Sequence, residues 1–251
     1  MAVKKIIPCL DMKDGKVVKG VKFLDVKDVG DPPTFAAKYE KDGADEIAFL
    51  DISATAEGRR TMLKAVAATA EVLTVPLAVG GGIGSKNIME EVLKAGASKV
   101  SINTAAVSSP ELVKECAGAF GSDRLIVAID AKREGDKWIV YTHMGLKSSG
   151  IDAIEWAQKM ERLGAGEILL TSIDADGVKE GYDIPLTAAV ADAVSIPVTA
   201  SGGCGSAEHI YDVLTETKAV SALAASIFHY NDYTVTDVKK YLRDRGVSVR
   251  L

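Results

Sequence analysis

The chain has 251 residues, of which 47% are hydrophobic and 26% are charged, and its formal net charge is −5 at pH 7. This composition is typical of a folded globular protein with a sizeable core. The small negative charge gives no electrostatic basis for binding nucleic acid or an anionic membrane, so we expect neither as a partner.

Cysteine and histidine usage argues against metal chemistry. The chain has three cysteines, Cys9, Cys116 and Cys204. Their odd number and wide spacing argue against a disulfide framework or a zinc site. The three histidines have no metal-ligand spacing, and we expect no metal and no cofactor. The N-terminal residues lead into a strand without a signal-peptide pattern, and no apolar run approaches 18 residues, so we expect a cytoplasmic protein.

Short apolar runs that predict strands alternate with amphipathic stretches that predict helices. Eight such pairs in 251 residues give about 31 residues a pair, the size of a strand–helix unit in a barrel. We therefore predict an α/β fold, a single (β/α)8 TIM barrel domain over residues 1–251. In chain order, the predicted strands lie near 5–11, 46–52, 76–80, 99–103, 125–130, 167–172, 196–201 and 220–225, and the helices near 33–43, 59–73, 87–96, 110–119, 152–164, 185–194, 206–217 and 234–246.

The two halves of the chain resemble each other at a fixed offset. Residues 43–50 match residues 164–171, and residues 75–85 match residues 196–206, both 121 positions further on. A repeat of this length contains four strand–helix units, which predicts half-barrels of about 1–122 and 123–251. A doubly wound open sheet is the alternative, but it does not explain the equal halves.

Glycine runs end two of the predicted strands. Gly80-Gly81-Gly82 and Gly202-Gly203 each stand between an apolar strand and a helix, where glycine lets the backbone approach an anion near free helix N–H groups. The alternative is that these glycines only make turns. Because the two runs occupy matching barrel positions, they predict two phosphate sites and a substrate with a phosphate at each end.

Two aspartates end strands that face each other across an eight-stranded barrel. Asp11 and Asp130 can act as a general acid and a general base if their environments separate their pKa values, although they could also be strand-end caps. Asp51 and Asp176 add carboxylates at the same mouth, as substrate ligands or structural groups, and Thr171 and Ser201 could supply neutral hydrogen bonds.

Three further features remain open from the residues alone. The connection from Met12 to about Asp31 is long and lysine-rich, which favours a lid over the mouth, with a solvated hairpin as the alternative. Cys9 shares a strand face with Asp11 and is expected to be a packed thiol. Charged residues begin four strands and form either a ring across the barrel floor or ordinary flanking charges; they are Lys5, Glu46, Lys99 and Glu167.

These motifs resemble the cyclase subunit of imidazole glycerol phosphate synthase, an enzyme of histidine biosynthesis, over essentially the whole chain. The resemblance is carried by residues 7–11, 13–20, 49–52, 80–83, 100–106, 128–132, 164–170, 176–177, 181–183, 200–203 and 224–229. It implies a duplicated barrel that converts a bis-phosphorylated ribulosyl aminoimidazole carboxamide nucleotide into imidazole glycerol phosphate and an aminoimidazole carboxamide ribonucleotide. Ammonia adds to the ribulosyl ketone, the imidazole ring closes and a carbon–nitrogen bond is cleaved.

The resemblance also implies roles for individual residues. Asp11 and Asp130 match the catalytic pair, and Lys19 matches a lid lysine. The positions that match phosphate-binding residues are Gly82, Asn103, Thr104, Gly177, Gly203, Ala224, Ala225 and Ser226. The family takes its ammonia from a glutaminase subunit docked at the strand N-termini, and Lys5, Glu46, Lys99 and Glu167 match the gate of that passage.

Four positions depart from the pattern. Lys5 replaces a common Arg at the gate, and Ser98 replaces a frequent Asp at the glutaminase contact. Lys22 replaces an Asn in the lid, and Met144 replaces a Gly in the loop after the fifth strand. The resemblance leaves a sister isomerase that needs no ammonia, or a barrel that only activates a glutaminase, as alternatives. A Schiff-base aldolase using Lys19 fits less well, because a lid is solvated.

Overall fold

The strands close into a barrel. In the computed structural model, which describes residues 3–21, 24–52 and 56–251, with side chains at 19–29 and 56–61 left out, the eight predicted strands pair in parallel in sequence order and the last pairs with the first. They are β1 (Lys5–Lys13), β4 (Ile47–Asp51), β5 (Leu77–Gly80), β6 (Lys99–Ile102), β7 (Leu125–Glu134), β10 (Glu167–Ser172), β11 (Val198–Ser201) and β12 (Ser221–Ala224). The predicted (β/α)8 barrel is confirmed.

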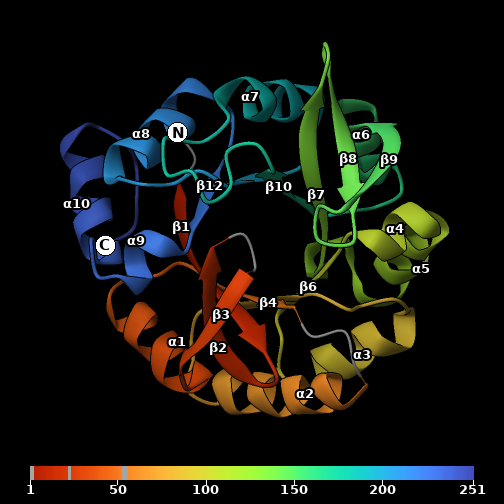
Figure 1. Ribbon diagram of the computed structural model, residues 1–251, viewed down its shortest axis with the longest axis horizontal. Helices are drawn as coiled ribbons and strands as arrows, with labels where there is room; N and C mark the ends of the chain where they lie inside the picture. Colours follow the sequence, from red (N-terminus) through yellow and green to blue (C-terminus); the bar gives the residue numbers. More distant parts are fainter. Residues whose placement is uncertain (1–2, 22–23, 53–55) are drawn as a thin grey trace.

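The helices form an outer ring around these strands (Figure 1). The eight predicted helices correspond to α1 (Pro32–Lys41), α2 (Ala56–Ala70), α3 (Lys86–Lys94), α5 (Glu111–Phe120), α6 (Ala153–Arg162), α7 (Ile184–Ala193), α8 (Ala207–Glu216) and α10 (Val235–Asp244). Two short helices, α4 (Thr104–Ser108) and α9 (Ser226–His229), and a 3-10 turn at Ser122–Arg124 were not predicted. The main core lies between the strands and the helix ring, and a smaller apolar cluster fills the barrel interior.

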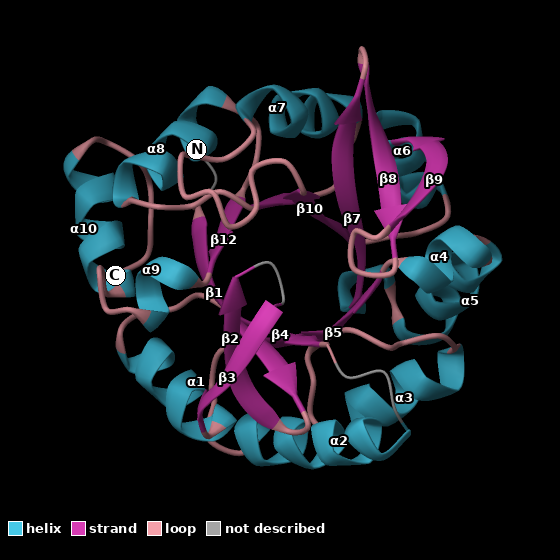
Figure 2. Ribbon diagram, viewed as in Figure 1, coloured by secondary structure: helices cyan, strands magenta, loops and turns pink. Residues whose placement is uncertain are grey.

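Two antiparallel additions extend the barrel at β1 and β7 (Figure 2). The hairpin of β2 (Lys16–Val21) and β3 (Leu24–Gly30) occupies the predicted lid segment, and its role as a lid stays a prediction. Strands β8 (Lys137–Thr142) and β9 (Lys147–Asp152) form the second addition, which the sequence reading placed in a loop. The tip of the β7–β8 hairpin extends beyond the helix ring (Figure 1).

The two halves repeat the same side-chain clamps at the 121-residue offset. Glu40 Oε1 accepts hydrogen bonds from the N–H groups of Thr74 and Val75, and Glu161 Oε1 accepts them from Ser195 and Ile196. In both halves the hydroxyl of the first partner also donates to the same oxygen. Each clamp holds the connection that leads into β5 or β11, so the outer layers of the two halves are built alike.

Candidate active site

Asp11 and Asp130 lie on opposite sides of the barrel mouth. Asp11 is near the end of β1, where it pairs with Leu50 of β4, and Asp130 is on β7, where it pairs with Thr171 of β10. Three barrel strands separate β1 from β7 in each direction around the sheet. The C-terminal strand ends of such a barrel carry the catalytic residues, which is where both carboxylates stand.

The Asp130 carboxylate is almost fully enclosed. Nδ2 of Asn103 donates to Asp130 Oδ2 at 2.9 Å and to the carbonyl of Tyr141 at 3.2 Å. Burial raises the pKa of Asp130 to about 6, the Asn103 hydrogen bond opposes that rise, and the nearby Asp176 carboxylate adds to it. A carboxyl group with a pKa near neutrality can exchange protons with a substrate at physiological pH.

Asp11 has a different environment. The Cys9 thiol, two residues earlier on the same strand face, lies 4.0 Å from Asp11 Oδ1. Burial raises the pKa of Cys9 well above its usual range, with Asp11 and Asp176 adding to the rise, so the thiol stays protonated. Cys9 is 2% exposed, as expected of a packed thiol. Asp176 therefore acts electrostatically on residues of both facing strands.

The glycine runs are required for close backbone approach. Gly81 has φ +98°, and a Cβ atom there would lie 2.0 Å from the carbonyl oxygen of Asp51. Gly203 has φ +100°, and its Cβ would lie 1.9 Å from the carbonyl oxygen of Gly181. Any side chain would collide with backbone at either position. The turn alternative is thus sufficient to explain these glycines, and phosphate binding stays a prediction.

The predicted phosphate residues gather at the starts of short helices. Thr104 and Ser226 are the first residues of α4 and α9, and the first N–H groups of a helix have no acceptor within it. Ala224 ends β12 and Ala225 precedes α9. Gly82 and Gly203 stand in the turns that lead to α3 and α8, and Gly177 lies between β10 and α7. The backbone of each half therefore offers donors around the mouth.

The side chains of Asn103 and Thr104 have partners within the protein. Asn103 contacts Asp130, as described above, and its buried Oδ1 has no hydrogen-bond partner among the described residues. Thr104 Oγ1 accepts a hydrogen bond from the N–H of His143 at 3.1 Å. Sequence reasoning missed Tyr141 and His143, because it missed β8. The two residues Gly135 and Asp136, which join β7 to β8, were the available hairpin signal.

The remaining mouth residues are placed by the strand ends. Asp51 and Ser201 end β4 and β11, and Thr171 lies one residue before the end of β10. Lys19, predicted to be a lid residue, lies on β2 opposite Lys27, but its side chain is outside the described residues, as is the whole of Lys22. Met144 is 53% exposed in the turn between β8 and β9.

At the other end of the barrel, four charged residues form a chain of ion pairs. Lys99 Nζ lies 2.9 Å from Glu46 Oε2 and 2.8 Å from Glu167 Oε2, and Lys5 Nζ lies 3.9 Å from Glu46. Burial raises the pKa of Glu46, although Lys99 opposes the rise. Burial works to lower the pKa of Lys99, but the two carboxylates outweigh it and raise that pKa, so Lys99 stays charged.

Apolar side chains separate this charged layer from the mouth. The interior cluster consists of Ile7, Cys9, Ala48, Ala78, Ile126, Leu169 and Leu223. Two of these side chains, those of Ala48 and Ala78, are small. Ser98, which precedes Lys99, accepts a hydrogen bond on its hydroxyl from the N–H of Leu77 at 3.2 Å.

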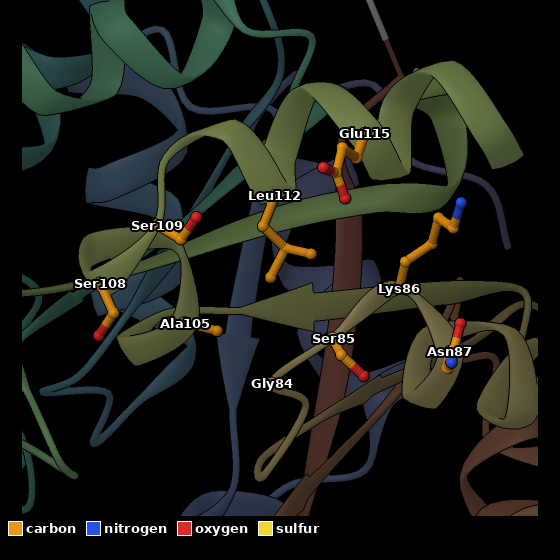
Figure 3. A pocket seen from close by; sticks show the side chains of 9 residues that line it. All are labelled: Gly84, Ser85, Lys86, Asn87, Ala105, Ser108, Ser109, Leu112 and Glu115. Atoms are coloured by element: carbon orange, nitrogen blue, oxygen red, sulfur yellow. The ribbon is translucent and has the colours of Figure 1, made fainter.

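A pocket of about 390 Å³ lies elsewhere, between α3, α4 and α5 (Figure 3). Gly84 to Asn87 form one side of it, and Leu112 and Glu115 of α5 line the facing side. None of the predicted site residues lines this pocket. In the part of the chain that the structure describes, no group of three or more His, Cys, Asp or Glu residues could hold a metal ion, and no helix is long and apolar enough to cross a membrane.

The family comparison agrees with this architecture. A family model described as "Histidine biosynthesis protein" matches residues 5–234, which include all eight barrel strands and both aspartates. The match covers most of the 251 residues, and these residues form the closed barrel. The chain therefore belongs to the histidine biosynthesis protein family and is a histidine biosynthesis enzyme.

Proposed function

We propose that this protein is the cyclase subunit of imidazole glycerol phosphate synthase. Its substrate is the bis-phosphorylated ribulosyl aminoimidazole carboxamide nucleotide, and its second substrate is ammonia. The observation that carries the proposal is the chain of ion pairs below an apolar barrel interior, in which Lys5 is half-exposed and joins the largely enclosed Glu46, Lys99 and Glu167. The sister isomerase also needs two aspartates and two phosphate sites. Its reaction uses no ammonia, so it gives no reason for a layer of ion pairs at the N-terminal ends of the strands.

The facing aspartates suit the chemistry of ring formation. Ammonia attacks the ribulosyl ketone carbon and forms a carbinolamine, which must lose its hydroxyl group as water. The new nitrogen then attacks the neighbouring amidine carbon, closes the imidazole ring and expels the aminoimidazole carboxamide ribonucleotide. These steps move protons at nitrogen and oxygen, and the ring becomes aromatic when the CH2 carbon beside the former ketone also loses a proton. Asp130, with a pKa of about 6, is suited to both giving and taking such protons, and Asp11 reaches the substrate from the opposite strand.

The phosphate-binding groups would hold the substrate stretched across the mouth. One phosphate would lie at the Gly82 turn and the start of α4, and the other at the Gly203 turn and the start of α9. This orientation places the reacting carbons between the strands that carry Asp11 and Asp130. Holding both ends reduces the entropy cost of bringing the ketone, ammonia and two carboxyl groups together.

The ammonia would come from a glutaminase subunit docked at the strand N-termini. Three exposed apolar side chains, Val3, Val72 and Leu251, lie in the connections at this end. Lys4 pairs with Val249, which brings the C-terminal segment beside the start of β1. Exposed apolar residues around a charged centre favour a protein partner over bulk solvent. Neutral ammonia would then pass from the partner through the apolar barrel interior to the mouth, without being released into bulk water.

The decisive experiment measures turnover of the bis-phosphate substrate by the isolated chain with excess ammonium salt at alkaline pH. We expect consumption of substrate that depends on ammonium and falls roughly 10²- to 10⁴-fold in Asp130→Asn and in Asp11→Asn. Asp136→Asn, in the exposed β7–β8 turn, is the matched control and should retain wild-type turnover. Conversion that ignores ammonium would identify the isomerase. Absence of conversion, with stimulation of an added glutaminase, would identify a scaffold.

A further inference from the structure

The pairing of the barrel strands stops earlier in one half than in the other. β5 and β6 pair at three positions, and the last pair is Gly80 with Ser101. β11 and β12 pair only at Thr199 with Ser221 and at Ala200 with Ala222. The next pair, Ser201 with Leu223, would be the counterpart of Gly80 with Ser101. This pair is absent, so the pairing of β11 with β12 stops one residue earlier, beside the turn and the helix start that would hold the second phosphate.

The hydroxyl of Tyr182 supplies a contact at this position. It donates a hydrogen bond to the carbonyl oxygen of Leu223 at 2.9 Å, on a residue that pairs with Ile7 of β1 but not with β11. The Cys204 side chain, which follows Gly203, interacts with the same hydroxyl. Tyr182 is 6% exposed, so its ring is packed and its hydroxyl is held in place. One side chain thus connects the end of β12 to the turn after β11.

The backbone around Tyr182 is fixed on both sides. The N–H of Gly181 donates to the carbonyl of Gly203 at 2.9 Å, which holds the segment against the glycine turn. Asp183 caps α7 by accepting from the N–H of Leu186 at 2.9 Å, and it also accepts from the Ser172 hydroxyl at 3.1 Å. The tyrosine ring therefore projects from a rigid support toward the end of β12.

We propose that Tyr182 is a positioning residue that fixes the end of β12 relative to the Gly203 turn and thereby sets the second phosphate site. This inference rests on the proposed function, because it assumes phosphate at the Gly203 turn and the start of α9. Tyr182 does not touch the phosphate. It fixes the distance between two sets of backbone N–H groups, which must converge on one anion. Without the Tyr182 hydroxyl, the Leu223 carbonyl loses a buried hydrogen-bond partner. The N–H groups of the Gly203 turn and of the start of α9 are then no longer held at a fixed spacing.

The test is a titration with inorganic phosphate followed by backbone amide NMR. Amides of Gly82 and Thr104 report the first site, and amides of Gly203 and Ser226 report the second. In the wild type we expect saturable shifts at both sites. In Tyr182→Phe we expect affinity at the second site to fall roughly three- to tenfold, the effect of one hydrogen bond, with the first site unchanged. Tyr211→Phe on α8, where the ring packs against Tyr241, is the matched control and should change neither site.

The outcomes separate this inference from the proposed function. Binding at both sites in the wild type, with equal affinities in Tyr182→Phe, would overturn the inference and leave the two-phosphate substrate standing. Equal weakening at both sites would also overturn it, because a local spacer acts on one site. A wild type that binds phosphate at neither site would overturn the proposed function and the inference with it.

A second measurement covers the case in which Tyr182→Phe does not fold. Coupling between two events is reciprocal, so phosphate at the second site must also stabilise the bond between Tyr182 and Leu223. In the wild type, the Tyr182 hydroxyl proton should exchange with solvent more slowly when phosphate saturates that site. An exchange rate that phosphate does not change would overturn the inference.

Steady-state kinetics of a folded Tyr182→Phe variant give a further check. The variant should raise KM by the same factor by which phosphate affinity falls at the second site, and it should leave kcat within about twofold, since the hydroxyl does not touch the reacting atoms.

Discussion

In the first half of the barrel, the pairing of β5 with β6 reaches Gly80 and Ser101, whereas the pairing of β11 with β12 in the second half stops one residue earlier. The outer layers of the two halves do not differ in this way, since Glu40 and Glu161 make the same three contacts. The facing aspartates differ again: Asn103 holds Asp130, and Cys9 lies beside Asp11. The two halves therefore share the supports of the outer layer, and they differ at the strand ends, where we propose that the substrate binds.

The largest stability effect is expected where the halves share one cation. Lys99→Met would leave Glu46 and Glu167 buried without their common partner, and we expect the free energy of unfolding to fall by about 3 kcal/mol. Chemical denaturation measures this change. Lys94→Met, which breaks an exposed pair with Glu90, is the control and should cost less than about 0.5 kcal/mol. Equal effects of the two variants would show that the floor pairs contribute no more than surface pairs.

Asp130→Asn should stabilise the protein although it sharply lowers turnover. The folded pKa of Asp130 is about 6 against an ordinary value of 3.8, so between about pH 4 and 6 the folded state binds more protons than the unfolded state. Raising the pH through this window therefore lowers the free energy of unfolding, by roughly 2–3 kcal/mol in total. Asparagine removes this loss, so the variant should gain stability at pH 7.5.

Thermal unfolding of both proteins at pH 7.5 and at pH 3.5 checks this sign. The difference in unfolding free energy should vanish at the lower pH, where Asp130 is protonated in both states. Asp136→Asn should show no gain at pH 7.5, because its side chain is exposed. A gain in Asp130→Asn that persisted at pH 3.5 would have a cause other than the buried charge.

Asn103→Leu should move the pH profile of turnover. The Asn103 amide holds the pKa of Asp130 below the value that burial alone would give. Its removal should therefore shift the limb of kcat/KM that reports Asp130 to higher pH by roughly one unit, whether Asp130 acts as acid or base. Asn87→Ala, at the exposed start of α3, should leave the profile in place. If the limb stays near pH 6 in Asn103→Leu, the asparagine does not influence the pKa of Asp130.

The smallest effects are expected at the matched clamps. Glu40→Ala and Glu161→Ala each remove one acceptor for three donors, and each should lower the free energy of unfolding by about 1 kcal/mol. Because the two clamps lie in different halves, the double variant should show the sum of the two losses. Unequal single losses would mean that the halves differ in stability even where their contacts are the same.

The barrel and its two aspartates could be predicted because they depend on local pattern. Strands buried on both sides appear as short apolar runs, and helices between them appear as amphipathic stretches, so the eight strands were found to within a few residues. The hairpin of β8 and β9 was missed because its alternation is short and partly exposed. With it were missed the contacts of Asn103 and Thr104 to Tyr141 and His143.

The sequence by itself determined which residues stand at the strand ends, since strand length, glycine position and the repeat follow from neighbouring residues. Only the tertiary structure decided what those residues meet. The pairing of Asn103 with Asp130, of Lys99 with two glutamates, and of Tyr182 with the Leu223 carbonyl joins residues 27 to 68 positions apart. Barrel closure brings such groups together, and burial then makes each contact energetically significant, because no water replaces a lost partner.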